Sequence, residues 1–147
     1  NRRFGGNLDL GRLSLLAMYH DCCEVYTSDL PTPVKHLHPE LKTAFQEIES
    51  LLSMRFYSMV PEDLREDFEE VFLPAKDDPQ LAPMLKLIKA ADVLCAYLKC
   101  LEESGLGNND FSNAESALKE SLKALDVPEI EEFFKEFGTD MSIPFAL

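Results

Sequence analysis

The sequence has no tryptophan, few glycines and few basic side chains, and the shortage of basic side chains excludes one class of partner. Lysine and arginine number 14 against 27 acidic residues, and the formal net charge is −13. A chain this acidic repels a phosphate backbone, so a nucleic-acid polymer is not an expected partner. No apolar run approaches the roughly 20 residues that a membrane span requires. The opening N-R-R-F-G-G-N is not followed by the apolar segment of a signal peptide. We therefore expect a cytoplasmic protein that does not bind membranes.

Cysteine is also scarce, and its four positions do not suggest a disulfide framework. Cys22 and Cys23 are adjacent, Cys95 and Cys100 lie in an apolar stretch, and no C-x-x-C pair occurs. A chain of 147 residues folds without disulfides, so we expect reduced, buried thiols. Nothing near Cys22 and Cys23 in the sequence favours a thiolate, so buried thiols are preferred to a nucleophile or a thiolate metal site.

Hydrophobic residues make up 46% of the chain and charged residues 28%, which is typical of a soluble globular protein. The length suits one domain with a real core, so we predict a single domain over residues 1–147. Residues 1–7 are basic and contain glycine, and they resemble a connector.

Apolar residues at three- and four-residue spacing predict helices, and no period-2 strand of useful length occurs. In the helix over 40–59, the apolar series falls at Leu41, Phe45, Ile48, Leu52 and Phe56, with Glu47 and Glu49 facing outward. The predicted helices cover residues 8–26, 40–59, 61–72, 80–104, 109 or 110 to 125, and 128–137. Residues 27–39 form a proline-rich loop, and residues 138–147 are extended. The predicted fold class is all-α, with about five to seven helices.

The stretch M-Y-H-D-C-C-E-V-Y-T-S-D-L-P-T-P-V-K, residues 18–35, gathers acid–base and metal-binding groups at the end of an apolar helix. On a helix, Glu24 lies one turn from both His20 and Asp21. Those two diverge by about 100° around the axis, and a cation between their directions would take both as ligands. The simpler interpretation is a partly buried helix histidine with solvated acids.

Asp92 bears on that choice because it lies in the middle of the apolar stripe of residues 80–104, between Ile88 and Cys95. An ionised carboxylate on a core face is costly unless it is paired, hydrogen-bonded or bound to a metal. Lys89, one turn away, is an alternative partner. An inward Asp opposite an inward His–Asp pair matches a metal site in the core of a helical bundle. Mixed imidazole and carboxylate ligands suit Mn²⁺, Co²⁺, Fe²⁺ or Zn²⁺.

Other groups carry less weight. Lys35 would assist an anion, but a single lysine is weak evidence. His36 and His38 flank Leu37 beside prolines and are expected on the loop surface. The sequence contains no Walker-type glycine loop, no G-x-S-x-G and no H-E-x-x-H motif. The −13 charge does not exclude a small anionic substrate, because a bound divalent cation reverses the local field.

Three segments, taken in order, resemble a known family. They are A-M-Y-H-D, E-V-Y-T-S-D-L-P-T-P-V-K and K-A-A-D-V-L-C-A-Y-L-K-C-L-E-E. Together they are similar to the bacterial HD-domain 5′-deoxynucleotidases of the YfbR type, from about Asn1 to Phe137. The resemblance implies an all-helical HD fold that removes phosphate from deoxyribonucleoside 5′-monophosphates with one divalent metal ion. It also implies a homodimer.

Carried over position by position, the resemblance assigns roles to individual residues. His20, Asp21 and Asp92 would be metal ligands, and Glu24 the acid–base residue. The nucleotide pocket would be lined by Asp29, Leu30, Pro31 and Thr32.

The sequence departs from the family pattern before His20. The family has an earlier ligand histidine and an Arg-Trp pair upstream, and neither occurs here. We therefore predict an HD domain that is incomplete at its N-terminus, with weak metal binding and poor activity as written. Two alternatives stay open: an HD phosphohydrolase acting on another nucleotide, and an inactive HD domain that binds a nucleotide or a partner protein.

Overall fold

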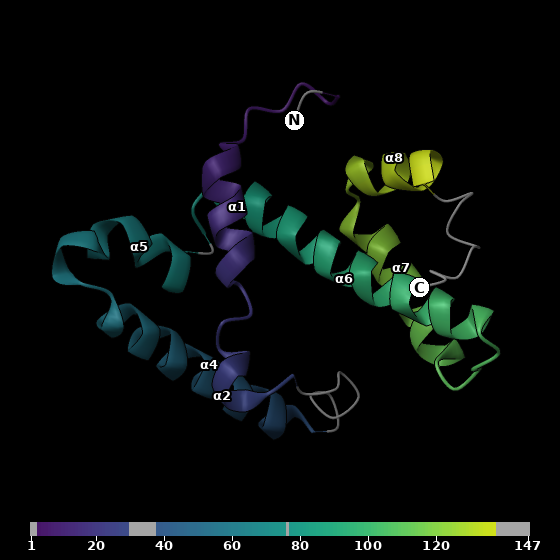
Figure 1. Cartoon of the computed structure of the whole chain (residues 1–147), viewed down its shortest axis with the longest axis horizontal. Coiled ribbons are helices and arrows are strands. Elements are labelled where there is room, and N and C mark those ends of the chain that lie inside the picture. The colour runs from purple at the N-terminus through teal and green to yellow at the C-terminus, as the bar shows by residue number, and fades with distance from the viewer. Residues whose placement is uncertain (1–2, 30–37, 76, 138–147) are drawn as a thin grey trace. The chain divides into compact units, whose positions relative to one another are not determined.

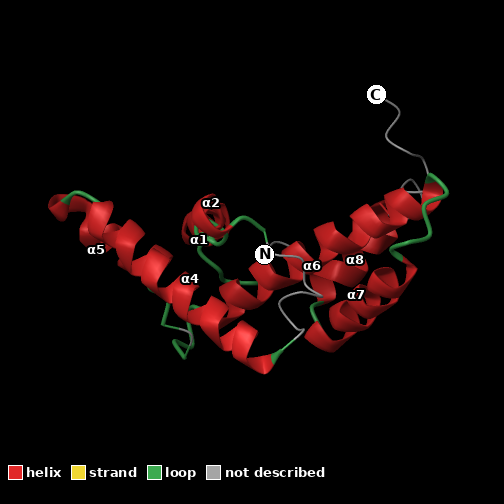
Figure 2. Cartoon of the chain, turned by 90° about the horizontal axis from the view of Figure 1, so that it is seen from below, coloured by secondary structure: helices red, strands yellow, loops and turns green. Residues whose placement is uncertain are grey.

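The computed structural model describes residues 3–29, 38–75 and 77–137 (Figure 1). Every regular element in these ranges is a helix, as Figure 2 shows, and this confirms the all-α prediction. None of these helices combines the length and the hydropathy needed to cross a bilayer. The chain divides into two compact units, residues 1–81 and residues 82–147, and each is described by itself.

The N-terminal unit contains four α-helices and a short 3-10 helix among its described residues. They are α1 (Leu10–Tyr19), α2 (Glu24–Thr27), α4 (Pro39–Met59), η1 (Glu62–Leu64) and α5 (Arg65–Phe72). Asp9 caps α1 by accepting a hydrogen bond from the backbone N–H of Arg12 at 3.1 Å. The pair of Arg12 with Glu70 then links α1 to α5.

Aromatic rings form much of the interior of this unit. Phe72 is buried, and its ring centroid lies 5.5 Å from that of Tyr19 and 6.0 Å from that of Phe56. Phe68 packs on both Tyr19 and Phe72. Each such aromatic pair contributes about 0.5–1.5 kcal/mol beyond the area it buries. The aromatic cluster therefore joins α1, α4 and α5.

Helix α4 was predicted to bury an apolar stripe, and the structure changes that picture. None of its residues is buried: Phe45, Leu52 and Phe56 are half-buried, and Ile48 is exposed. The helix is the one the spacing predicted, but its apolar face is only partly covered by the described residues of its own unit.

The C-terminal unit contains α6 (Ala82–Gly105), α7 (Ser112–Leu125) and α8 (Pro128–Phe137), close to the predicted ranges. Its core is Val93, Leu94, Tyr97 and Leu122. Around this core pack Leu98, Leu101, Leu118, Leu125, Ile130, Phe133 and Phe134. Gly107 turns the chain after α6 with φ of +87°, a conformation that favours glycine. α7 begins at Ser112, two or three residues after the predicted start at 109 or 110, and Phe111 precedes it without a side-chain capping bond.

The four cysteines are free thiols, as predicted, but they are not all buried. Cys23 and Cys100 are buried, Cys22 is half-buried and Cys95 is exposed. The stripe of α6 that packs on α7 and α8 runs through Val93, Leu94 and Tyr97 and bypasses Cys95, so the prediction of a buried Cys95 was wrong. The predicted extended segment 138–147 lies outside the described residues.

Candidate active site

The sequence predicted one helix over residues 8–26, but the structure breaks it at the His–Asp pair. α1 ends at Tyr19, and α2 begins at Glu24. Between them the chain tightens into turns: the N–H of Cys22 donates to Tyr19 O, and the N–H of Glu24 to Asp21 O. His20 and Asp21 therefore lie on a turn, where side chains need not diverge by the helical 100° or so.

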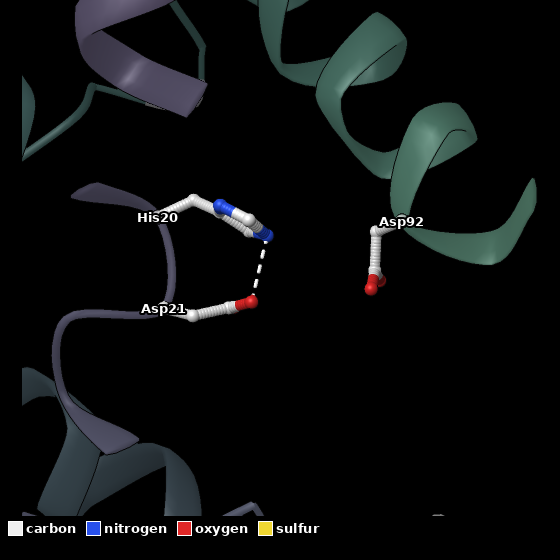
Figure 3. A group of neighbouring side chains, drawn as sticks. All are labelled: His20, Asp21 and Asp92. Carbon is white, nitrogen blue, oxygen red and sulfur yellow. Dashed lines mark ion pairs between the residues drawn. The ribbon is translucent and has the colours of Figure 1, made fainter. Parts of the chain in front are cut away.

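The ring of His20 is held at both nitrogens. Nδ1 lies 2.8 Å from Ala17 O, and because a carbonyl oxygen only accepts, Nδ1 carries the hydrogen. Nε2 lies 2.8 Å from Asp21 Oδ2, the ion pair drawn in Figure 3. A backbone carbonyl that receives Nδ1–H is the usual way to orient a metal-binding imidazole, with Nε2 as the ligand atom. Both side chains are solvent-accessible, so a ligand can reach them.

The geometry of this pair fits a cation. With the hydrogen on Nδ1, a neutral imidazole directs its Nε2 lone pair at a carboxylate lone pair, which is repulsive unless a proton or a cation lies between them. Two ligands at right angles, as in octahedral coordination, each about 2 Å from a metal ion, lie about 2.8 Å apart. The observed separation of 2.8 Å between Nε2 and Oδ2 is close to that value.

A cleft of about 660 Å³ opens beside the pair, entirely within the N-terminal unit. This volume falls in the range of small-molecule sites, about 300–1,000 Å³. His20, Asp21 and Glu24 all line it, so the predicted acid–base residue shares a cavity with two of the predicted ligands. The remaining lining residues are Cys23, Thr27, Ser28, Phe45, Gln46, Glu49, Ser50, Ser53, Met54, Phe72, Leu73 and Pro74.

Cys23 connects the His–Asp turn to the opposite side of the cleft. Its buried Sγ donates to Glu49 O at 3.5 Å and lies 3.5 Å from Ser53 Oγ. Burial and the neighbouring Cys23 raise the pKa of the Cys22 thiol to about 11, so at neutral pH Cys22 is protonated. The interpretation of this cysteine pair as unreactive thiols agrees with both observations.

Asp92 lies on α6 in the C-terminal unit, and its surroundings differ from the prediction. Its side chain is 43% exposed, and its Oδ2 is 2.6 Å from Lys89 Nζ. The prediction that it lies on the core face was wrong, because the core of this unit forms on the stripe of Val93, Leu94 and Tyr97. The cost of desolvating a carboxylate therefore gives no argument for a metal here. The ion pair with Lys89 is the alternative the sequence left open, and Figure 3 shows the Asp92 carboxylate extending from α6.

Some of the predicted substrate residues can be placed and others cannot. Asp29 is exposed just after α2. Leu30, Pro31 and Thr32 lie outside the described residues, as do Lys35 and His36. His38 is the residue that precedes α4, and it makes no side-chain capping bond.

The sequence analysis missed the wall of the cleft that α4 supplies. Gln46, Glu49, Ser50 and Ser53 all line the cavity, and Glu49 is also exposed, as predicted. A signal was present: polar residues at 46, 49, 50 and 53 recur at the three- and four-residue steps of one helix face. A polar stripe opposite an apolar one is the usual pattern of a surface helix, so these four residues by themselves do not indicate a binding site.

Comparison with known proteins identifies relatives along nearly the whole chain. The family model described as 5′-deoxynucleotidase YfbR-like matches residues 1–141. A 5′-deoxynucleotidase of Vibrio cholerae serotype O1 is 39% identical over 143 residues, which covers 97% of this chain and 72% of the relative. The 5′-deoxynucleotidase YfbR of Escherichia coli is 44% identical over 138 residues, which covers 93% of this chain and 67% of the relative. The same protein of Shigella boydii serotype 18 matches equally well. The chain belongs to the YfbR-like family of 5′-deoxynucleotidases.

Proposed function

We propose that this chain hydrolyses deoxyribonucleoside 5′-monophosphates with one divalent metal ion held by His20, Asp21 and Asp92. Membership of the 5′-deoxynucleotidase family supports the reaction. The observation that carries the site is the His20–Asp21 pair, with its oriented ring, its 2.8 Å spacing and its position in a cleft. We also propose that the protein acts in the cytoplasm, as its composition suggests, and that it is a homodimer, as the family resemblance implies.

The donor set suits the proposed metal. One imidazole nitrogen and two carboxylate oxygens are available from His20, Asp21 and Asp92. Such a set is typical of Mn²⁺, Co²⁺, Fe²⁺ or Zn²⁺ sites and leaves positions open for substrate. Asp92 is accessible and held only by an exposed ion pair, a kind of interaction worth about 0–1 kcal/mol, so binding a metal would cost it little.

The chain's own residues account for the rest of the reaction. A bound divalent ion would polarise the phosphoryl oxygen and lower the pKa of a coordinated water. Glu24 accepts the proton of the attacking water as the new P–O bond forms. It returns a proton to the 5′ oxygen as the ester P–O bond breaks, so the products are the deoxynucleoside and inorganic phosphate. Such acid–base help is worth about 10²–10⁴ in rate.

The substrate is oriented by residues after α2 and by the cleft itself. Asp29, Leu30, Pro31 and Thr32 line the nucleotide pocket in this proposal, as the family resemblance implies. Holding the ester in place lowers the entropic part of the barrier.

The decisive experiment measures phosphate release from deoxynucleoside and ribonucleoside 5′-monophosphates by the purified chain supplied with Mn²⁺ or Co²⁺. We expect release from deoxynucleotides that stops on chelation and returns when metal is added. Release from cyclic or polyphosphorylated nucleotides alone would indicate another HD phosphohydrolase. Binding of nucleotide without turnover, unaffected by Glu24→Ala, would indicate an inactive binding domain.

A matched pair of variants tests Asp92. Asp92→Asn removes the proposed ligand, whereas Lys89→Ala removes only its ion-pair partner. If Asp92 binds the metal, Asp92→Asn abolishes metal-dependent turnover and Lys89→Ala retains it. If Asp92 serves only the ion pair, the two variants behave alike, and the three-residue site is wrong. Circular dichroism checks that both variants keep their helical content.

A further inference from the structure

The cleft beside the His–Asp pair has two chemically different sides. One side is the turn with His20, Asp21 and Glu24, which carries the imidazole and two carboxylates. The other side is the α4 wall, which we define as Phe45, Gln46, Glu49, Ser50 and Ser53. These five positions follow one face of the helix. The wall offers an aromatic ring, an amide, two hydroxyls and a carboxylate.

Charge decides which half of a nucleotide each side accepts. Among the described lining residues there is no lysine or arginine, and His20 is the only side chain there able to carry positive charge. A phosphate therefore has a favourable place only beside His20 and a cation bound with it. Glu49 on the α4 wall would repel a phosphate. The neutral half of the substrate is left for the wall.

The wall is anchored to the His–Asp turn. Cys23, two residues after Asp21, bonds to the backbone of Glu49 and lies 3.5 Å from the hydroxyl of Ser53. Two further contacts join α2 to α4: the ring of Tyr26 lies 5.7 Å from that of Phe56, and the guanidinium of Arg55 lies 5.2 Å from the Tyr26 ring. These contacts fix the distance between the His–Asp turn and the α4 wall. A site that selects its substrate by size requires such a fixed distance.

We infer that the α4 wall binds the nucleoside half of the substrate. This inference rests on the proposed function. Phe45 is half-buried and offers its ring for stacking with a base. Gln46 offers both donors and an acceptor, and Glu49 accepts from a sugar hydroxyl or a base amino group. Contacts remote from the reacting phosphorus supply binding energy for its orientation.

The test separates nucleoside binding from phosphate binding by product inhibition. Deoxyadenosine carries no phosphate, so its inhibition constant reports the nucleoside half alone, and the inhibition constant of inorganic phosphate reports the other end. We expect Gln46→Ala to raise the inhibition constant of deoxyadenosine by about 3- to 10-fold, the loss of one or two hydrogen bonds. Its inhibition constant for phosphate should stay within about 2-fold, a negligible free-energy change.

Glu47→Ala is the matched control, because Glu47 adjoins Gln46 on the exposed surface of α4 but is not among the residues that line the cleft beside the His–Asp pair. It should change neither constant. Equal effects of Gln46→Ala on both constants, no effect on either, or wild-type protein not inhibited by deoxyadenosine would each overturn the inference. A wild-type chain that releases no phosphate would refute the proposed function instead. Calorimetric titration with deoxyadenosine would then still decide whether the wall binds a nucleoside.

Discussion

The longest helix of the N-terminal unit and the longest helix of the C-terminal unit are similar in length but differ in how many of their side chains are buried. α4 has 21 residues and buries none of them, whereas α6 has 24 and supplies Val93, Leu94 and Tyr97 to a packed core. The N-terminal unit instead keeps polar side chains accessible around a cleft of about 660 Å³. The comparison indicates that the C-terminal unit contributes packing, while most of the predicted chemistry lies where packing is less complete. Binding regions commonly come from the less stable parts of a fold.

The largest expected effect comes from an acid in the cleft of the N-terminal unit. Glu24→Gln should lower kcat for deoxynucleotide hydrolysis by about 10²–10⁴, because the amide cannot accept the proton of the attacking water. Glu131→Gln makes the same change in the groove of the C-terminal unit, which Tyr97 and Phe134 also line, and should leave kcat unaltered. Steady-state kinetics with both variants checks this. Similar losses in both would remove the functional contrast between the units.

The next effect concerns the cores. Leu122 is buried among α6 and α8 side chains, so Leu122→Ala should reduce the free energy of unfolding by about 2–5 kcal/mol. Leu52→Ala in α4 removes a half-buried side chain and should cost clearly less. Urea denaturation followed by circular dichroism measures both. A larger loss for Leu52→Ala would show that α4 carries more of the packing than the described residues indicate.

A smaller effect is expected for ion pairs. Arg12 bonds to Glu70 through two nitrogens in a half-buried setting, so Arg12→Ala should destabilise by about 1 kcal/mol. Lys123 and Glu120 form an exposed pair one turn apart on α7, and Lys123→Ala should destabilise clearly less than Arg12→Ala because solvent screens the pair. Thermal unfolding at low and high salt distinguishes them. If Arg12→Ala and Lys123→Ala lowered the melting temperature equally at low salt, the prediction would be contradicted.

The smallest effect is chemical and leaves the fold intact. Cys95 is exposed on α6, whereas the Cys22 thiol has a pKa of about 11 and at pH 8 is ionised in only about one molecule per thousand. Iodoacetamide should therefore modify Cys95 first. Raising the pH increases the thiolate fraction and should accelerate labelling of Cys22. Peptide mapping by mass spectrometry gives both rates, and earlier labelling of Cys22 would refute the environment described for it.

Sequence periodicity predicted most helices to within a few residues, because each depends on side chains one turn apart. It failed at residues 8–26, where the helix breaks after Tyr19, and where Cys23, between the two helices, contacts Glu49, 26 positions away. It also failed to orient α6 fully: the face that packs with Leu122 runs through Val93, Leu94 and Tyr97. This orientation placed Asp92 and Cys95 outside the core.

The sequence by itself determined which groups exist and where the helices run, since helical propensity and the identity of His20, Asp21 and Glu24 are local properties. Only the tertiary structure decided which faces those helices turn toward one another. It placed the polar face of α4 across a cleft from His20 and Asp21. Such arrangements arise from contacts between residues distant in sequence, and a pattern within one helix does not encode them.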